Sequence, residues 1–193
     1  MEKIVIDANV LYSNTLRSLF LWLMWRGECA TVWTKEIWEE VFRNYSKDSE
    51  KEKIFRTQIE NNVFVKFHSC MCILESDFSP AGLPDLNDEH VLALARQERA
   101  ALIVTFNLRD FPEEKLKSYG IKSSHPDSYL CALLQRSGDA VKESIAYQMK
   151  ANHLTKPKKN MYFESLKKSG VTEFSKMLEG MDHSGNLFPE VWT

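Results

Sequence analysis

Residues 4–11 read IVIDANVL, a short apolar run that ends in an acid, followed two residues later by an asparagine. Three consecutive β-branched residues bounded in this way are typical of a strand buried on both faces of a parallel sheet. We therefore expect a strand at residues 4–6, with Asp7 at its carboxyl end. In open α/β sheets, ligands bind beyond the carboxyl ends of the strands.

A second apolar run, ALIV at residues 101–104, predicts another buried strand, which ends in the polar turn TFNLRD at residues 105–110. Between and after these strands, apolar residues recur at helical spacing. The predicted helices span residues 15–26, 35–45, 48–60, 88–99, 113–119, 128–135, 140–154 and 161–178. Strands that alternate with helices indicate an α/β fold with a mostly parallel central sheet, flanked by helices.

The length of 193 residues suits one compact domain with an appendage. Lysines become frequent after Gly138, and Pro157 separates two helical patterns. We expect a domain at residues 1–137 and a helical C-terminal extension at residues 138–193.

The net charge of -2 excludes a strongly basic nucleic-acid coat protein. No secretory leader is recognised at the start, because an acid interrupts the first apolar run. The most apolar stretch, residues 19–25, is too short to span a bilayer. The Cys-x-Cys pair at residues 70–72 lacks a matching zinc-ligand pair. We expect a cytoplasmic protein with no membrane association.

Several acids stand where chemistry could use them. Asp7 closes a strand, a position that a simple turn or cap residue would also occupy. Asp88 precedes Val91, Leu92 and Ala95 on the buried stripe of its helix, although capping by Asp85 would explain an acidic helix start. Helical spacing does not separate the three glutamates of the second helix as candidates. The full candidate set is Asp7, Glu36, Glu39, Glu40, Asp85, Asp88, Asn107 and Asp110.

A cluster of carboxylates has a physical requirement. Two carboxylates about 4 Å apart repel by about 4 kcal/mol at an effective dielectric constant of about 20. Three or four together are unfavourable unless protons or cations bind between them. All-oxygen ligand sets suit Mg²⁺ and Mn²⁺, and no histidine or cysteine cluster in the sequence competes for another metal.

Taken in order, these segments resemble the motifs of the PIN-domain family, and in particular its VapC-type toxin ribonuclease branch with a helical C-terminal extension. The opening strand with its acid is residues 4–11, and the second motif is WTKEIWEEV at residues 33–41. The third is GLPDLNDEHVLALA at residues 82–95, and the fourth is IVTFNLRDFP at residues 103–112. Residues 152–157, NHLTKP, are similar to the C-terminal segment of that branch.

The resemblance implies a PIN-like three-layer fold and a site for Mg²⁺ or Mn²⁺. The ligands and catalytic residues would be Asp7, Glu40, Asp88 and Asp110, and the supporting residues Asn9, Asp85, Thr105 and Asn107. It also implies an endoribonuclease that hydrolyses RNA phosphodiester bonds with a metal-activated water. This enzyme would be the toxin of a type II toxin–antitoxin pair, with a cognate antitoxin protein and a homodimeric state. Lysines of the C-terminal extension would contact the RNA backbone or simply form a solvated helix face.

Three other interpretations stay open. Many PIN domains carry an acid where this chain has the neutral Asn107, which leaves room for a catalytically weakened RNA- or protein-binding module. A phosphohydrolase of the haloacid-dehalogenase kind would use Asp7 as nucleophile, but it would need an acid where Asn9 stands. The third interpretation treats the acids as caps and surface charges of an unrelated α/β domain.

Overall fold

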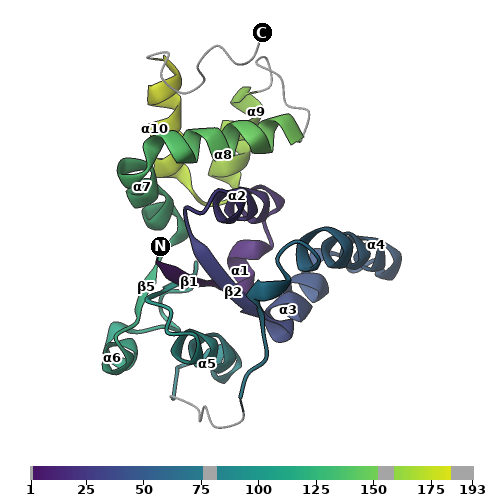
Figure 1. Cartoon of the computed structure of the whole chain (residues 1–193), viewed down its shortest axis with the longest axis vertical. Helices are drawn as coiled ribbons and strands as arrows, with labels where there is room; N and C mark the ends of the chain where they lie inside the picture. The colour runs from purple at the N-terminus through teal and green to yellow at the C-terminus, as the bar shows by residue number, and fades with distance from the viewer. Residues whose placement is uncertain (1, 76–81, 152–158, 184–193) are drawn as a thin grey trace. The chain divides into compact units, whose positions relative to one another are not determined.

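Figure 1 shows the computed structural model of the chain, which describes residues 2–75, 82–151 and 159–183. The chain divides into two compact units that do not follow the sequence order. We call residues 2–12 and 30–124 the sheet unit, and residues 13–29 with 125–193 the helical unit. The predicted domains, residues 1–137 and 138–193, are segments expected to fold as units, which compactness alone does not test. This division stays a prediction.

The sheet unit is built on five parallel strands in the order β3-β2-β1-β4-β5. They are β1 (Lys3–Ile6), β2 (Ala30–Thr34), β3 (Met71–Cys72), β4 (Leu102–Val104) and β5 (Lys122–Ser124). Ile4, Val5 and Ile6 are all buried, as a central strand of a covered sheet requires. The predicted α/β class with a parallel sheet and flanking helices, followed by a helical C-terminal extension, is confirmed.

Strands β2, β3 and β5 are absent from the sequence prediction. Strand β5 has the sequence KSS and β3 only two residues, too few for a hydrophobic period. Both lie at edges of the sheet and pair through backbone groups alone with one neighbour. Local patterns therefore do not reveal them, and the neighbouring strands decide their conformation.

The register of the sheet brings two chain segments to one edge. Ile6 of β1 pairs with Val104 of β4, and the Asp7 N–H donates to the Val104 carbonyl oxygen at 3.0 Å. The next residue of each strand, Asp7 and Thr105, therefore lies at the carboxyl edge of the sheet. Residues almost a hundred positions apart in sequence become neighbours there.

Two helices of the sheet unit begin at side-chain caps that can be recognised in the sequence. Thr34 accepts a hydrogen bond from the Ile37 N–H at 3.4 Å, and Asp48 accepts from Glu50 and Lys51. The helices are α1 (Ala8–Leu11), α3 (Lys35–Tyr45), α4 (Ser49–Ile59), α5 (Glu89–Gln97) and α6 (Glu113–Leu116). The predicted starts at residues 35 and 48 are confirmed to within one residue.

The helical unit joins an early helix to the C-terminal ones. Its helices are α2 (Asn14–Trp25), α7 (Pro126–Arg136), α8 (Gly138–Ala151), α9 (Lys159–Lys168) and α10 (Thr172–His183). The single helix predicted for residues 161–178 is wrong, because Gly170 adopts a φ of +83° and separates α9 from α10. The motif at residues 152–157 lies outside the described residues.

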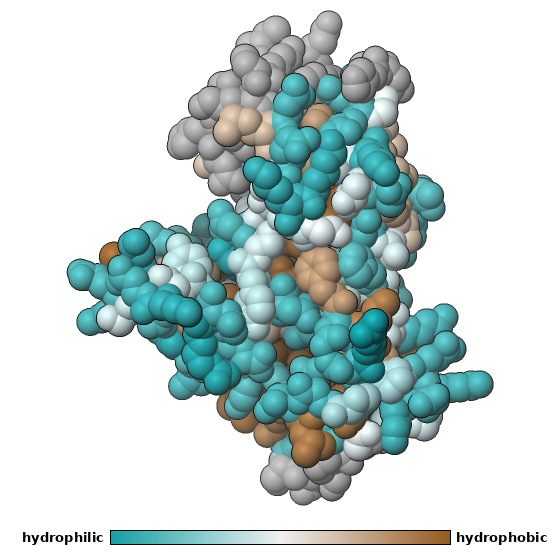
Figure 2. All heavy atoms as spheres, turned by 180° about the vertical axis from the view of Figure 1, so that it is seen from behind, coloured by the Kyte–Doolittle hydropathy of each residue, from teal (hydrophilic) through white to brown (hydrophobic). Residues whose placement is uncertain are grey.

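The surface is mostly polar on the face drawn in Figure 2, where hydrophobic residues show through among hydrophilic ones. Large exposed apolar side chains include those of Ile73, Leu86 and Val65. Within the described residues, no helix is both long and apolar enough to cross a membrane.

Candidate active site

Asp7 is the most buried acid of the predicted set, with 4% of its surface exposed. Its Oδ2 accepts hydrogen bonds from Asn9 Nδ2 at 2.6 Å and from Thr105 Oγ1 at 2.7 Å. Burial raises the pKa of Asp7 above its usual value, and the hydrogen bond from Thr105 opposes that rise. The carboxylate is thus held rigidly in a place that disfavours its charge.

Thr105 is the centre of the network that orients Asp7. Its hydroxyl donates to Asp7, and it accepts from Asn9 Nδ2 at 3.0 Å and from the Asn107 N–H at 2.9 Å. A hydroxyl has one proton and two lone pairs, so all three are used. Asn9 Oδ1 in turn accepts from the Phe106 N–H at 3.2 Å. The predicted supporting residues Asn9 and Thr105 therefore tie the end of β1 to the turn after β4.

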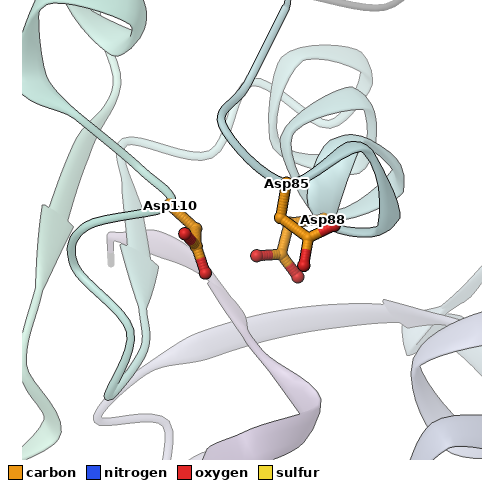
Figure 3. A group of neighbouring side chains, drawn as sticks. All are labelled: Asp85, Asp88 and Asp110. Carbon is orange, nitrogen blue, oxygen red and sulfur yellow. The ribbon is translucent and has the colours of Figure 1, made fainter.

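Three aspartates lie close together near the carboxyl ends of the strands. Asp85 and Asp88 come from the segment before α5, and Asp110 comes from the turn after β4. In Figure 3 their carboxylates point toward one another across a small gap. One oxygen from each lies within 4.8 Å of the others. Among the described residues, no lysine or arginine forms an ion pair with any of the three.

The electrostatic effect of this arrangement falls mainly on Asp88. Burial raises its pKa to about 7, and the nearby charges of Asp7, Asp110, Asp85 and Glu40 act in the same direction. Burial is thus the larger cause of the raised pKa of Asp88, and repulsion from the surrounding carboxylates adds to it. A bound cation would relieve that repulsion.

Glu40 lies on α3 and faces a histidine. Its Oε1 is 3.3 Å from His90 Nε2, while His90 Nδ1 lies 2.7 Å from the Asn87 carbonyl oxygen. Burial raises the pKa of Glu40, and the charge of Asp7 adds to the rise, whereas His90 and Arg43 oppose it. The charges of Asp7 and Asp85 both raise the pKa of Glu40, although Glu40 lies outside the group of three aspartates.

Asn107 and Asp110 interact directly. Asn107 Nδ2 donates a hydrogen bond to Asp110 Oδ2. Asp110 also belongs to the aspartate group, so the turn after β4 supplies a negative charge although Asn107 is neutral. The amide of Asn107 orients that carboxylate.

The structure groups the predicted residues in three sets. Asp85, Asp88 and Asp110 form the tight group, and Asp7 with Asn9, Thr105 and Asn107 forms the network beneath it. Glu40 faces His90 at one side. Asp85, predicted as a supporting residue, both caps the turn before α5 through the Asn87 N–H at 2.9 Å and joins the tight group.

His90 was not among the site residues predicted from the sequence. Its side chain is only 17% exposed, and its Nε2 is buried without a well-aligned hydrogen-bond partner. The sequence feature that could have indicated a role at the site is that His90 follows Asp88 by two positions. Residues i and i+2 do not share a helix face, so the contact with Glu40 depends on how α3 and α5 lie.

The donor set can be tested against a divalent cation. It consists of carboxylate oxygens that lie close together and lack a basic partner within the described residues. Mg²⁺ and Mn²⁺ prefer such oxygen ligands, and both tolerate sites that keep several waters. The residues present therefore fit such an ion.

Comparisons with known proteins bear on the same segments. A family profile described as PIN domain matches residues 3–109, a range that contains Asp7, Glu40 and Asp88 and ends one residue before Asp110. The chain is 50% identical over 58 residues to "Putative ribonuclease VapC50" of Mycobacterium tuberculosis (strain ATCC 25618 / H37Rv). That alignment covers 30% of this chain and 34% of the mycobacterial protein, about a third of its length. No solved structure gives a significant match.

Proposed function

This chain belongs to the PIN domain family, and from that premise we propose that it is a divalent-metal-dependent endoribonuclease of the VapC type. The observation that carries the proposal is the convergence of Asp85, Asp88 and Asp110 above the buried Asp7 at the carboxyl edge of the sheet. Acids gathered without basic partners favour a metal-dependent hydrolase over a surface of helix caps.

Asp88, Asp110 and Asp7, with Glu40, would hold Mg²⁺ or Mn²⁺. The bound ion would activate a water for attack on phosphorus and offset charge on the scissile phosphate. Thr105 and Asn9 hold the Asp7 carboxylate in one orientation through their hydrogen bonds. Asn107 does the same for Asp110. Such preorganisation lowers the cost of bringing ligands and substrate together.

The proposal extends to biological partners. The similarity to a VapC-type relative supports a role as the toxin of a toxin–antitoxin pair, with a cognate antitoxin protein and a homodimeric state. Purified protein whose mass in solution, measured by light scattering, equals two chains would support the dimer. Coexpression with the gene product encoded beside it, followed by loss of toxicity, would support the antitoxin.

The structure gives less support to two of the alternative interpretations. The haloacid-dehalogenase interpretation needs a general acid at Asn9, but the Asn9 side chain donates to Asp7 instead. A weakened binding module rested on the neutrality of Asn107. Asp110 supplies the charge that Asn107 lacks, which favours an active enzyme.

The testing experiment is cleavage of total cellular RNA by purified full-length protein. Reactions contain Mg²⁺, Mn²⁺ or a chelator, and compare the wild type with Asp7→Asn and with Asp139→Asn. Asp139 is a matched control because its side chain is 95% exposed and, among the described residues, forms an ion pair with Lys142 alone. We expect discrete cuts that need the metal and that persist in Asp139→Asn. In Asp7→Asn the rate of cleavage should fall by about a hundredfold or more, because a carboxylate ligand of the metal is lost.

Cleavage that survives in a folded Asp7→Asn protein would point to a contaminating nuclease and count against the proposal. Absence of cleavage under every metal condition, together with no shift of the melting temperature by Mg²⁺ or Mn²⁺, would sink it.

A further inference from the structure

A groove of about 450 Å³ lies beside the acidic group and follows two turns of α3. Its walls are Lys35, Glu36, Glu39, Glu40, Arg43 and His90. Glu40 is also one of the proposed metal ligands, and it contacts His90 on the same wall, so the groove shares Glu40 with the candidate active site.

The groove is less acidic than its three glutamates suggest. Arg56 on α4 binds Glu39 through two hydrogen bonds, from Nη1 at 2.6 Å and from Nη2 at 2.9 Å. This pairing lowers the pKa of Glu39 and offsets its charge. Glu40 faces His90 and is a proposed metal ligand. Within the part of the chain that the structure describes, Glu36 forms no ion pair, and two cations, Lys35 and Arg43, line the same groove.

Arg43 differs from Arg56 in what its guanidinium does. Arg56 binds two carboxylates, those of Glu39 and Glu52. The side chain of Arg43 is exposed, and within the described residues its one hydrogen bond runs from Nε to the Glu39 carbonyl oxygen at 3.3 Å. The terminal nitrogens of a guanidinium are suited to paired hydrogen bonds with a phosphate.

The position of Arg43 relative to the site is also suitable. It follows Glu40 by three residues, so the two side chains share one face of α3. Both side chains line the groove, so Arg43 lies along the same wall as a proposed metal ligand. An RNA strand that followed this wall away from the candidate active site would pass Arg43.

We propose that Arg43 binds a backbone phosphate of the RNA strand next to the scissile one, and that the groove along α3 is the path of that strand. This inference rests on the proposed endoribonuclease function and names a substrate-binding residue for it. A phosphate contact carries no base specificity, so Arg43 would act on RNA of any sequence.

One competing explanation is that Arg43 merely offsets the repulsion between carboxylates. The two explanations predict different results for Arg43→Gln. If Arg43 only offsets that repulsion, its loss strengthens Mn²⁺ binding and leaves RNA affinity unchanged. If Arg43 contacts phosphate, its loss weakens RNA binding and reduces the dependence of that binding on salt.

The test measures binding of a fluorescent single-stranded RNA of mixed sequence to full-length protein by anisotropy, at several salt concentrations and with Mg²⁺ present. All proteins carry Asp7→Asn to prevent cleavage. Arg43→Gln and Arg43→Lys are compared with Arg99→Gln. Arg99 is an exposed arginine in the turn before β4, at the opposite edge of the sheet. Thermal melts confirm that each variant is folded.

We expect Arg43→Gln to bind RNA about tenfold more weakly at low salt and to lose about 0.7 from the slope of log affinity against log salt, the value for one phosphate contact on a single strand. Arg43→Lys keeps that slope because it keeps the charge, and Arg99→Gln matches the parent protein.

Parallel cleavage assays with the protein that retains Asp7 distinguish failure of the inference about Arg43 from failure of the proposed function. Metal-dependent cleavage together with unchanged affinity and slope in Arg43→Gln would overturn the inference and leave the proposed function standing. Tighter Mn²⁺ binding in Arg43→Gln with unchanged RNA affinity would do the same. If the protein that retains Asp7 cuts no RNA and the Asp7→Asn protein binds none, the proposed function is overturned, and the inference with it.

Discussion

At the scale of single residues, the site combines two kinds of carboxylate. Asp7 is buried and fully oriented by Thr105 and Asn9, whereas Asp88 sits in a group of acids that repel one another. The first kind needs hydrogen bonds to stay in place, and the second needs a cation. The metal-free protein should therefore carry a cost that depends on pH.

The pKa of Asp88 is about 7 in the folded chain, against an ordinary value of 3.8. Between these values the folded protein holds a proton that the unfolded chain has released. Stability is therefore lost as pH rises from about 4 through about 7. Discounted for partial exposure of the side chain, the loss is about 1–2 kcal/mol, or roughly 2–8 °C in melting temperature.

We predict that the protein in chelator melts at a lower temperature at pH 8 than at pH 5.5, and that Asp88→Asn is more stable than the wild type at pH 8. Mg²⁺ should remove most of the difference for the wild type, since bound ligand stabilises the folded state. Thermal melts at the two pH values check this. If Asp88→Asn is clearly destabilised and Mg²⁺ has no effect on either protein, Asp88 is a structural cap.

Among the secondary-structure elements, several helices begin where a side chain accepts a hydrogen bond from a backbone N–H of the first turn. The start of α10 is an instance that spans distant residues. Asp127 on α7 accepts from the Glu173 N–H at 3.0 Å and from the Phe174 N–H at 2.8 Å. A carboxylate at a helix N-terminus also interacts favourably with the helix dipole. Asp127 thereby fastens α10 to α7 within the helical unit.

We predict that Asp127→Ala lowers the free energy of unfolding by about 1–3 kcal/mol, because two backbone donors lose a charged acceptor. Asp139→Ala, a control on the exposed start of α8, should change it by less than about 0.5 kcal/mol. Denaturant unfolding followed by circular dichroism measures both. Equal effects of the two substitutions would contradict the capping role of Asp127.

In the whole molecule, the two compact units contain different residue ranges from the two predicted domains. Helix α2 belongs with α7 to α10, and polar side chains join them: Thr15 Oγ1 and Ser165 Oγ lie 2.5 Å apart, and Gln148 Nε2 donates to the Thr15 carbonyl oxygen at 2.9 Å. One of the C-terminal lysines is engaged in the same unit, since Lys167 pairs with Glu164 and Glu179. This favours a solvated helix face over an RNA contact for that lysine.

We predict that residues 1–137 alone do not fold cooperatively. Without α8 to α10, the apolar face of α2 and its polar partners would lie open to water, and such surfaces promote loosely packed or aggregated states. Melting curves and binding of a hydrophobic dye to the truncated chain test this. A cooperative melt near that of the full chain would instead support a domain boundary at residues 137 and 138.

Part of the candidate site was predictable because local sequence encodes it. Asp7 follows three β-branched residues, and the acids of motif three precede an amphipathic helix, so both positions could be assigned before the fold was known. The two roles of Asp85, the contact between Glu40 and His90, and the exposed guanidinium of Arg43 could not. Each depends on which elements lie together at one edge of the sheet.

The central strand β1, the capped helices α3 and α4 and the acids at the ends of strands could be located from local sequence, because caps and hydrophobic periods act between residues a few positions apart. Three features depend on the folded arrangement: Asp110 lies beside Asp85 and Asp88, Thr105 holds Asp7, and α2 packs with the C-terminal helices. These contacts link residues tens of positions apart, and packing of the sheet and helices, rather than any local preference, brings them together.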